Sequence, residues 1–159
     1  MTRRFDYAAN APGATRAFLA FHQSLSGNRL DPILHELINL RASQMNGCAF
    51  CADMHVKAAR LAGERELRLH HVATWRESQL FDARERAALE WTEALTALDG
   101  KGVAPETYDR LLDILGEDLL TDLTFAVVAI NGWNRLSVAS TPVPGSSDAL
   151  FGLDKAGLS

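Results

Sequence analysis

Both cysteines of the chain lie within one ten-residue run, NGCAFCADMH, which extends from Asn46 to His55. Cys48 and Cys51 are three residues apart, and His55 follows Cys51 by four. Two thiols at this spacing can close a disulfide with little movement of the chain, and an imidazole beside them can take up a thiol proton. The run therefore indicates thiol redox chemistry, with a metal site and two inert core cysteines as the alternatives.

A helix that begins at Cys48 would place these three side chains on one face. Each residue turns by about 100°, so Cys51 lies about 60° from Cys48 and His55 lies between them, at about 20°. The first turn of a helix has free N–H groups and the positive end of the macrodipole, which favour thiolate over thiol. A thiolate that attacks a peroxide becomes a sulfenic acid, and a second thiol three residues away can trap that acid as a disulfide.

Glu36 is a candidate partner for His55. It lies at the edge of the apolar stripe of the preceding predicted helix, and the short turn at Asn46 and Gly47 would let that edge fold back on the cysteine helix. A carboxylate in this place could set the protonation of the histidine. Taken alone, Glu36 is more often a solvated helix residue and His55 a structural histidine, so periodicity leaves both alternatives open.

Zinc binding is the second choice for this site. Cys48, Cys51, His55 and Glu36 supply four side chains of the types that bind zinc, but a structural zinc site usually draws on a second cysteine or histidine pair, which this sequence lacks. We therefore predict neither a metal nor another cofactor.

The remaining histidines and the tryptophans are not assigned to chemistry. Four histidines show no comparable spacing: His22, His35, His70 and His71. His35 is expected to point away from the apolar stripe of its neighbours. Three tryptophans are expected to serve in packing: Trp75, Trp91 and Trp133. The run NGWN at 131–134 is expected to mark a helix distortion or an interface.

Composition limits the class of protein. A chain of 159 residues suits one domain spanning residues 1–159. Its formal charge of −4 and its lack of a basic stripe argue against a nucleic-acid partner. No apolar run reaches the about 20 residues of a membrane span, and the start lacks a secretory signal, so we expect no membrane association and a cytoplasmic location. Thiols are kept reduced there, which favours a catalytic or metal-binding role for a close cysteine pair.

Apolar residues recur at intervals of three and four, and strict alternation is missing, which predicts an all-α fold. Asp31 and Pro32 form a helix start, and Asp82 with Glu85 resembles a capping box. The expected helices span residues 14–25, 32–45, 48–61, 64–74, 83–98, 105–116 and 117–139. Residues 140–159 are expected to form an irregular tail that wraps a surface or a neighbouring subunit.

The stretch ELINLRASQMNGCAFCADMH resembles the signature of the AhpD-like alkylhydroperoxidases within the carboxymuconolactone decarboxylase superfamily. That signature is a Glu, eleven residues, CxxC, three residues and a His, and this chain matches it with Glu36, Cys48, Cys51 and His55. The runs RERAALEWTEALT and AVVAINGWNRLSVAS resemble later helices of the same family.

The resemblance implies a bundle of about six to eight helices that assembles as a trimer or hexamer and reduces hydroperoxides in antioxidant defence. By analogy, Cys51 is the peroxidatic thiol, Cys48 the resolving thiol, and Glu36 with His55 the proton relay. A hydroperoxide is the implied substrate, and a protein or small-molecule dithiol is the implied reductant. Two alternatives remain: a thiol redox sensor or interaction module without turnover, and a Cys/His/Glu metal protein.

One position departs from the family pattern. AhpD has a histidine between its cysteines, where this chain has Phe50. The decarboxylases of the superfamily lack the cysteine pair, so decarboxylation of a ring lactone fits this chain poorly.

Overall fold

The computed structural model describes residues 2–158, and within them the regular elements are all helical, which confirms the predicted all-α class. The elements are α1 Tyr7–Asn10, α2 Pro12–Ser24, α3 Pro32–Met45, α4 Ala49–Leu61, α5 Glu66–His71, the 3₁₀ turn η1 Val72–Thr74, α6 Ala83–Ala97, α7 Pro105–Leu115, α8 Glu117–Ser140, α9 Asp148–Phe151 and the 3₁₀ turn η2 Leu153–Ala156. Along the described chain, none of these helices combines the length and apolar character needed to cross a bilayer.

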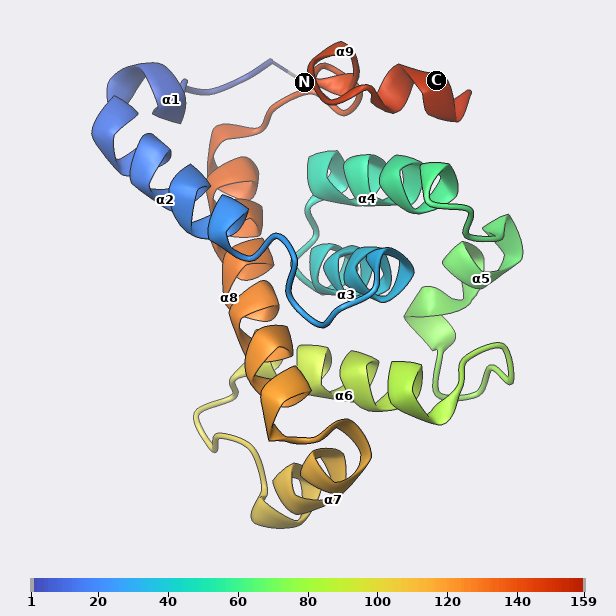
Figure 1. Ribbon diagram of the computed structural model, residues 1–159. Coiled ribbons are helices and arrows are strands. Elements are labelled where there is room, and N and C mark those ends of the chain that lie inside the picture. Colours follow the sequence, from blue (N-terminus) through green and yellow to red (C-terminus); the bar gives the residue numbers. More distant parts are fainter. Residues whose placement is uncertain (1, 159) are drawn as a thin grey trace.

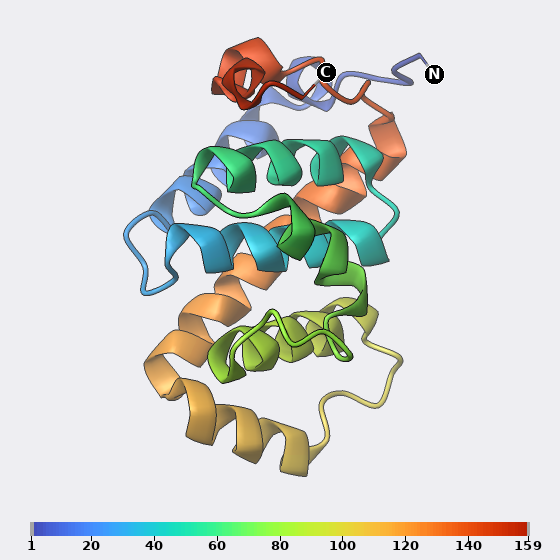
Figure 2. The same cartoon turned by 90° about the vertical axis from the view of Figure 1, so that its right-hand side faces the viewer.

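Helix α3 lies at the centre of the arrangement. Figure 1 shows α4 on one side of α3 and α6 on the other, with α7 beyond α6. Figure 2 shows the same order of α4, α3, α6 and α7 after a quarter turn, while the long helix α8 runs across this stack. α3 packs against α4, α6 and α8, so a side chain on α3 can be held by several neighbours at once.

The start of α3 follows the prediction from its sequence. Asp31 caps the helix, with its Oδ1 accepting a hydrogen bond from the Leu34 N–H at 2.9 Å, and Pro32 occupies the first turn. Four apolar side chains of α3 are almost fully buried: Leu34, Leu37, Ile38 and Leu40. They join two apolar clusters, one shared with α6, α7 and α8 and the other with α4, η1 and α6.

The run at 131–134 lies within α8, which continues through it without a break from Glu117 to Ser140. The expected helix distortion is therefore absent from this part of the described chain. Asn131 and Asn134 instead accept hydrogen bonds from the side-chain amide of Asn46, at 3.0 and 2.9 Å. These bonds tie the turn between α3 and α4 to α8 and so fix where α4 begins.

Gly132 in the same run lets α2 approach α8. A methyl group at this position would overlap the ring of Phe18, which also packs on Trp133 with ring centroids 4.6 Å apart. We expect Gly132→Ala to lower the free energy of unfolding by about 1 kcal/mol, because overpacking by about 2 kcal/mol outweighs the gain in helix propensity of about 1 kcal/mol.

Chemical denaturation measures this change, and Gly13→Ala in α2 is the matched control because nothing lies within 4 Å of its added methyl group. The control should be neutral or slightly stabilising. A Gly132→Ala variant as stable as the Gly13→Ala variant would contradict the packing described for Phe18.

The C-terminal tail returns across α4, as Figure 1 shows. Within the segment expected to be irregular, two short helical elements form, because Leu153 and Ala156 are buried there. An ion-pair cluster holds the tail: Lys57 Nζ of α4 donates to Asp148 at 2.7 Å and to Asp53 at 2.9 Å. The Lys57 side chain is only 5% exposed, so the tail covers it.

Loss of the Lys57 charge should release the tail. In Lys57→Met the carboxylates of Asp53 and Asp148 face each other without their cation, so we expect roughly tenfold faster limited proteolysis of the tail. Mass spectrometry of the fragments measures the rate. Lys155→Met is the matched control, because Lys155 lies in the same tail and is exposed. Equal cleavage rates in the two variants would contradict a holding role for Lys57.

Candidate active site

A cavity of about 480 Å³ lies beside α4, and its lining comes from α1, α2, α3, α4, α8 and the C-terminal tail. Three of the four residues predicted to take part in chemistry line it: Glu36 from α3, and Cys51 and His55 from α4. Most of the remaining lining is apolar. The fold thus brings a carboxylate, an imidazole and one sulfur together around a space large enough for a small organic molecule.

The fourth predicted residue, Cys48, lies just behind this lining. A disulfide joins it to Cys51, with the two Cα atoms 5.3 Å apart. Cys48 takes the N-cap position of α4, so the helix begins at Ala49, one residue later than predicted. The reason is its extended backbone, which lets the Cys48 Sγ accept a hydrogen bond from the Cys51 N–H at 3.2 Å. Cys51 lines the cavity and Cys48 does not, so the two sulfurs differ in access.

Glu36 holds two histidines through its two oxygens. Its Oε2 accepts a hydrogen bond from Nδ1 of His55 at 2.8 Å, and its Oε1 lies 3.3 Å from Nδ1 of His35. The contact with His55 joins α3 to α4 across the Asn46 turn, as the sequence suggested. Both His55 and Glu36 are less than a fifth exposed, so water screens this pair only partly.

The charge of Glu36 fixes the hydrogen position on His55. Burial would raise the pKa of Glu36, but hydrogen bonds from His35 and His55, together with the charges on those rings, lower the pKa from 4.5 to about 2. An ionised carboxylate only accepts hydrogen bonds, so Nδ1 of His55 must carry a hydrogen. When the ring is neutral, its free lone pair is therefore on Nε2, which can act as a base.

His35 was not assigned to chemistry and was expected to point away from the apolar stripe of its neighbours. It lines the cavity and contacts Glu36, a place that the sequence pattern did not predict. The flank of α3 that carries His35 faces this cavity, whose lining also includes residues of α2 and of the tail. The side-chain amide of Asn39, one turn later, lies 3.3 Å from Nε2 of His35. This spacing of four residues between two polar side chains was the available sequence signal.

The apolar part of the lining includes residues that sequence patterns assigned to packing or left unassigned. Trp75 and Trp91 are buried, as expected. Trp133 packs on Phe18 and also lines the cavity, and Phe50 from the CAFC run belongs to the same lining. His22 reaches the same cavity from α2, and four residues of the tail line it: Ser147, Leu150, Phe151 and Leu153.

The geometry gives no support to a metal centre. Between residues 2 and 158, no three His, Cys, Asp or Glu side chains are arranged so that they could hold a metal ion. The four residues weighed as zinc ligands instead form a disulfide and a separate carboxylate–imidazole pair.

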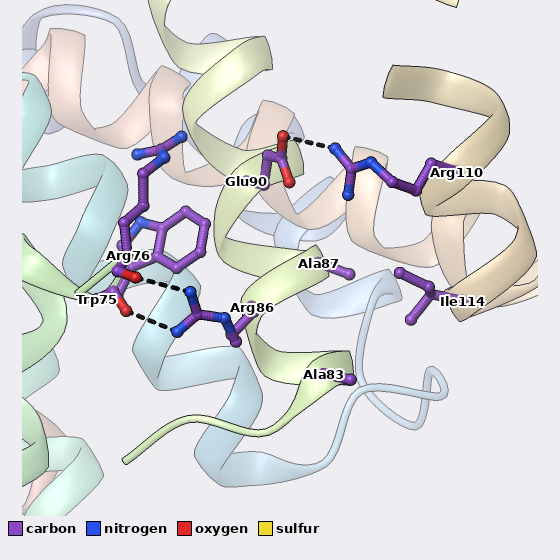
Figure 3. Close-up of a pocket in the computed structure, with 8 residues that line it drawn as sticks. All are labelled: Trp75, Arg76, Ala83, Arg86, Ala87, Glu90, Arg110 and Ile114. Atoms are coloured by element: carbon purple, nitrogen blue, oxygen red, sulfur yellow. Dashed lines mark hydrogen bonds and ion pairs between the residues drawn. The ribbon is translucent and has the colours of Figure 1, made fainter. Parts of the chain in front are cut away.

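A second hollow, of about 500 Å³, lies beside α6 and α7 (Figure 3). Its two central cations are already paired. Arg86 donates to the carbonyl oxygens of Trp75 and Arg76, at 2.9 and 2.7 Å, and Arg110 donates to Glu90 at 2.8 Å. The eight side chains of this lining include no cysteine or histidine. Of these two cavities, only the first is lined by a cysteine.

Comparisons with known proteins agree with this fold and with the family resemblance. The family model of the carboxymuconolactone decarboxylase family matches residues 12–94. The uncharacterized protein YdfG of Bacillus subtilis is 37% identical over 139 residues, which cover 87% of this chain and 95% of YdfG. The crystal structure of ATU0492 from Agrobacterium tumefaciens also matches, with 35% sequence identity and a TM-score of 0.85. The match covers 90% of this chain and 98% of ATU0492. ATU0492 is a protein of unknown function that is described as a candidate AhpD antioxidant defence protein.

A more distant match shows a shared fold only. The debrominase Bmp8, whose structure was solved with 2,3,4-tribromopyrrole bound, has 17% identity and a TM-score of 0.77, over 93% of this chain and 79% of that one. The family match and the extent of the likeness to YdfG and ATU0492 confirm the resemblance seen in the signature. The chain belongs to the carboxymuconolactone decarboxylase family and is AhpD-like.

Proposed function

We propose that this protein is a thiol-dependent peroxidase that reduces organic hydroperoxides by cycling Cys48 and Cys51 between dithiol and disulfide. The observation that carries the proposal is the shared cavity: Cys51 lines it together with the hydrogen-bonded pair of Glu36 and His55. A reactive thiol needs a base within reach and a group that orients this base. In this cavity His55 is the base and Glu36 is the group that orients it, and both line the cavity together with Cys51.

The first half of the reaction takes place at Cys51. Nε2 of His55 accepts the thiol proton, and Glu36 stabilises the resulting imidazolium ion. The thiolate attacks the terminal oxygen of the hydroperoxide, so a sulfur–oxygen bond forms and the O–O bond breaks. The leaving alkoxide takes up the proton and departs as an alcohol. Cys51 is oxidised to a sulfenic acid, and the hydroperoxide is reduced.

The second half of the reaction forms the disulfide between Cys48 and Cys51. The Cys48 thiolate attacks the Cys51 sulfur, the sulfur–oxygen bond breaks, and the hydroxyl group leaves as water after protonation. The product is the disulfide present in this structure. An external dithiol then reduces it by exchange and is itself oxidised. Each turnover converts one hydroperoxide and one dithiol into an alcohol, water and a disulfide.

The cavity favours an organic hydroperoxide over hydrogen peroxide. Its volume of about 480 Å³ and its mostly apolar lining suit the hydrocarbon part of a substrate. Phe50 adds apolar surface at the position where AhpD has a histidine. We therefore expect the physiological substrate to carry an apolar group.

Steady-state turnover tests the proposal directly. The reduced protein is mixed with tert-butyl hydroperoxide, cumene hydroperoxide or hydrogen peroxide and an excess of a dithiol such as reduced lipoamide. We expect multiple turnovers, with the largest kcat/KM for cumene hydroperoxide. Oxidation that stops after one equivalent with every dithiol would instead support a redox sensor, and no oxidation at all would overturn the proposal.

Reductive debromination is a second candidate, favoured by the aromatic side chains of Phe50, Trp133 and His22 around the cavity. The Bmp8 structure gives the chemical precedent of a debrominase with the same fold. Here one dithiol would become a disulfide while a carbon–bromine bond is replaced by a carbon–hydrogen bond, with release of hydrogen bromide. Bromide release from tribromopyrrole, faster than the reduction of any hydroperoxide, would favour this candidate.

A further inference from the structure

His22 is an unassigned titratable group within the cavity of the proposed peroxidase. It lies in α2, whereas Cys51 and His55 both lie in α4, so it reaches the cavity from a different element. Its ring packs edge-on against Trp133, with centroids 6.2 Å apart. No step of the reaction described above uses it.

The two nitrogens of His22 differ in their surroundings. Nδ1 is buried, and within residues 2–158 it has no hydrogen-bond partner. A buried N–H without an acceptor is rarer in proteins than a buried acceptor without a donor, so Nδ1 is the better place for the lone pair of the ring. The hydrogen of a neutral ring therefore belongs on Nε2. The ring lines the cavity, so this N–H is the one available to a molecule bound there.

The surroundings also keep the ring of His22 uncharged. Burial lowers the pKa of His22, and the positive charges of His35 and His55 lower it further, while Glu36 acts in the opposite direction. A neutral imidazole can donate one hydrogen bond without giving up its proton. Such a donor stabilises an oxygen that gains negative charge in a transition state.

Hydroperoxide reduction creates such an oxygen. When the Cys51 thiolate attacks one oxygen, the other leaves with negative charge, on the side away from the sulfur. His55 is one turn from Cys51 on the same helix and has already taken up the thiol proton. AhpD carries an additional imidazole between its cysteines, and Phe50 cannot donate a hydrogen bond in that place.

We propose that His22 is a further catalytic residue, whose Nε2–H donates a hydrogen bond to the leaving oxygen of the hydroperoxide. This inference rests on the proposed peroxidase function. It makes α2 part of the active site and gives the chain a second imidazole to replace the one missing at Phe50. The proton balance stays as described above: the proton that neutralises the alkoxide is the one released by Cys51.

The leaving group provides a test that separates this role from a structural one. In a peroxy acid the leaving group is a carboxylate, a much weaker base than an alkoxide, so it needs little help from a donor. We expect His22→Phe, which keeps an aromatic ring against Trp133, to lower kcat/KM for cumene hydroperoxide by at least about tenfold. The same variant should reduce peracetic acid at close to the wild-type rate.

His22→Gln is the matched variant, because its side-chain amide retains an N–H donor. We expect it to recover part of the rate that His22→Phe loses with cumene hydroperoxide. Alkylation of Cys51 by iodoacetamide should proceed equally in all three proteins, which shows that the thiol itself is unchanged. Equal losses with both oxidants, no loss with either, or no recovery in His22→Gln would overturn the role of His22. A wild-type protein that reduces neither oxidant would overturn the peroxidase function itself, and this inference with it.

Discussion

Replacement of Cys51 by serine is expected to lower the rate of hydroperoxide reduction by at least about 10³-fold, because the nucleophile is lost and the remaining groups cannot replace it. Cys51 is the sulfur that lines the cavity with Glu36 and His55. Consumption of cumene hydroperoxide by the reduced variant, with a dithiol in excess, measures the loss. A Cys51→Ser variant that keeps more than a tenth of the wild-type rate would contradict the assignment of Cys51.

Cys48→Ser is the matched control, because it removes the other sulfur of the same disulfide. This variant keeps Cys51 and its base, so we expect one rapid reduction of hydroperoxide per chain. Without the dithiol it should then stop at a sulfenic acid, which a dimedone adduct detects by mass. If Cys48→Ser were inert and Cys51→Ser formed the sulfenic acid, the roles of the two cysteines would be reversed.

Replacement of Glu36 by glutamine should slow the attack of Cys51 by about 10²-fold, because the imidazolium ion of His55 then lacks its negative partner. The glutamine side-chain oxygen can still accept the hydrogen bond from Nδ1 of His55, so the ring keeps its orientation. The second-order rate of thiol oxidation by cumene hydroperoxide measures the effect. An unchanged rate would show that the charge of Glu36 plays no part in the reaction.

Glu93→Gln is the control for the loss of a carboxylate at another site. Burial would raise the pKa of Glu93, but hydrogen bonds from Trp75, Arg76 and Arg41 lower it. Glu93 does not line the cavity. We therefore expect Glu93→Gln to lower the stability of the protein and to leave the oxidation rate of Cys51 within about twofold of the wild type.

The pKa of Glu36 also predicts how stability depends on pH. Its pKa is about 2 in the folded protein and 4.5 for an ordinary glutamate, so the unfolded chain binds the proton more tightly. The contribution to stability is therefore fully present above pH 4.5 and is lost as the pH falls toward 2. A shift of this size corresponds to roughly 3 kcal/mol. Acid unfolding of Glu36→Gln should show a correspondingly smaller dependence on pH in this range.

Much of the fold could be predicted because short capping motifs in the sequence determine where several helices begin. Asp31 with Pro32, and Asp82 with Glu85, form the caps that the structure contains, and the helices they start lie within one residue of the prediction. The four-residue helix α1 was missed, although Asp6 caps it by accepting hydrogen bonds from the N–H groups of residues 8 and 9. The four-residue helix α9 lacks a side-chain cap, so packing of the tail over α4 decides its structure.

The residues of the candidate site also fall into two groups, those that local sequence predicts and those that depend on packing between helices. Cys48, Cys51 and His55 are close in sequence, so helical geometry alone could group them. The edge of the apolar stripe made Glu36 a candidate, and the family signature supported it, because its contact with His55 depends on how α3 and α4 fold together. His22 could not be found from α2 alone. None of its residues is fully buried, and the cavity lies between this helix and others that are distant in the sequence, so packing decides that His22 reaches it.

The most direct test of the central claim is the product balance of a single turnover. The reduced wild-type protein is mixed with one equivalent of cumene hydroperoxide, and the alcohol, the free thiols and the protein mass are measured together. We predict one alcohol formed per chain, loss of both thiols, and a mass lower by two hydrogen atoms, which corresponds to the disulfide between Cys48 and Cys51. Unchanged hydroperoxide beside two free thiols would contradict the account.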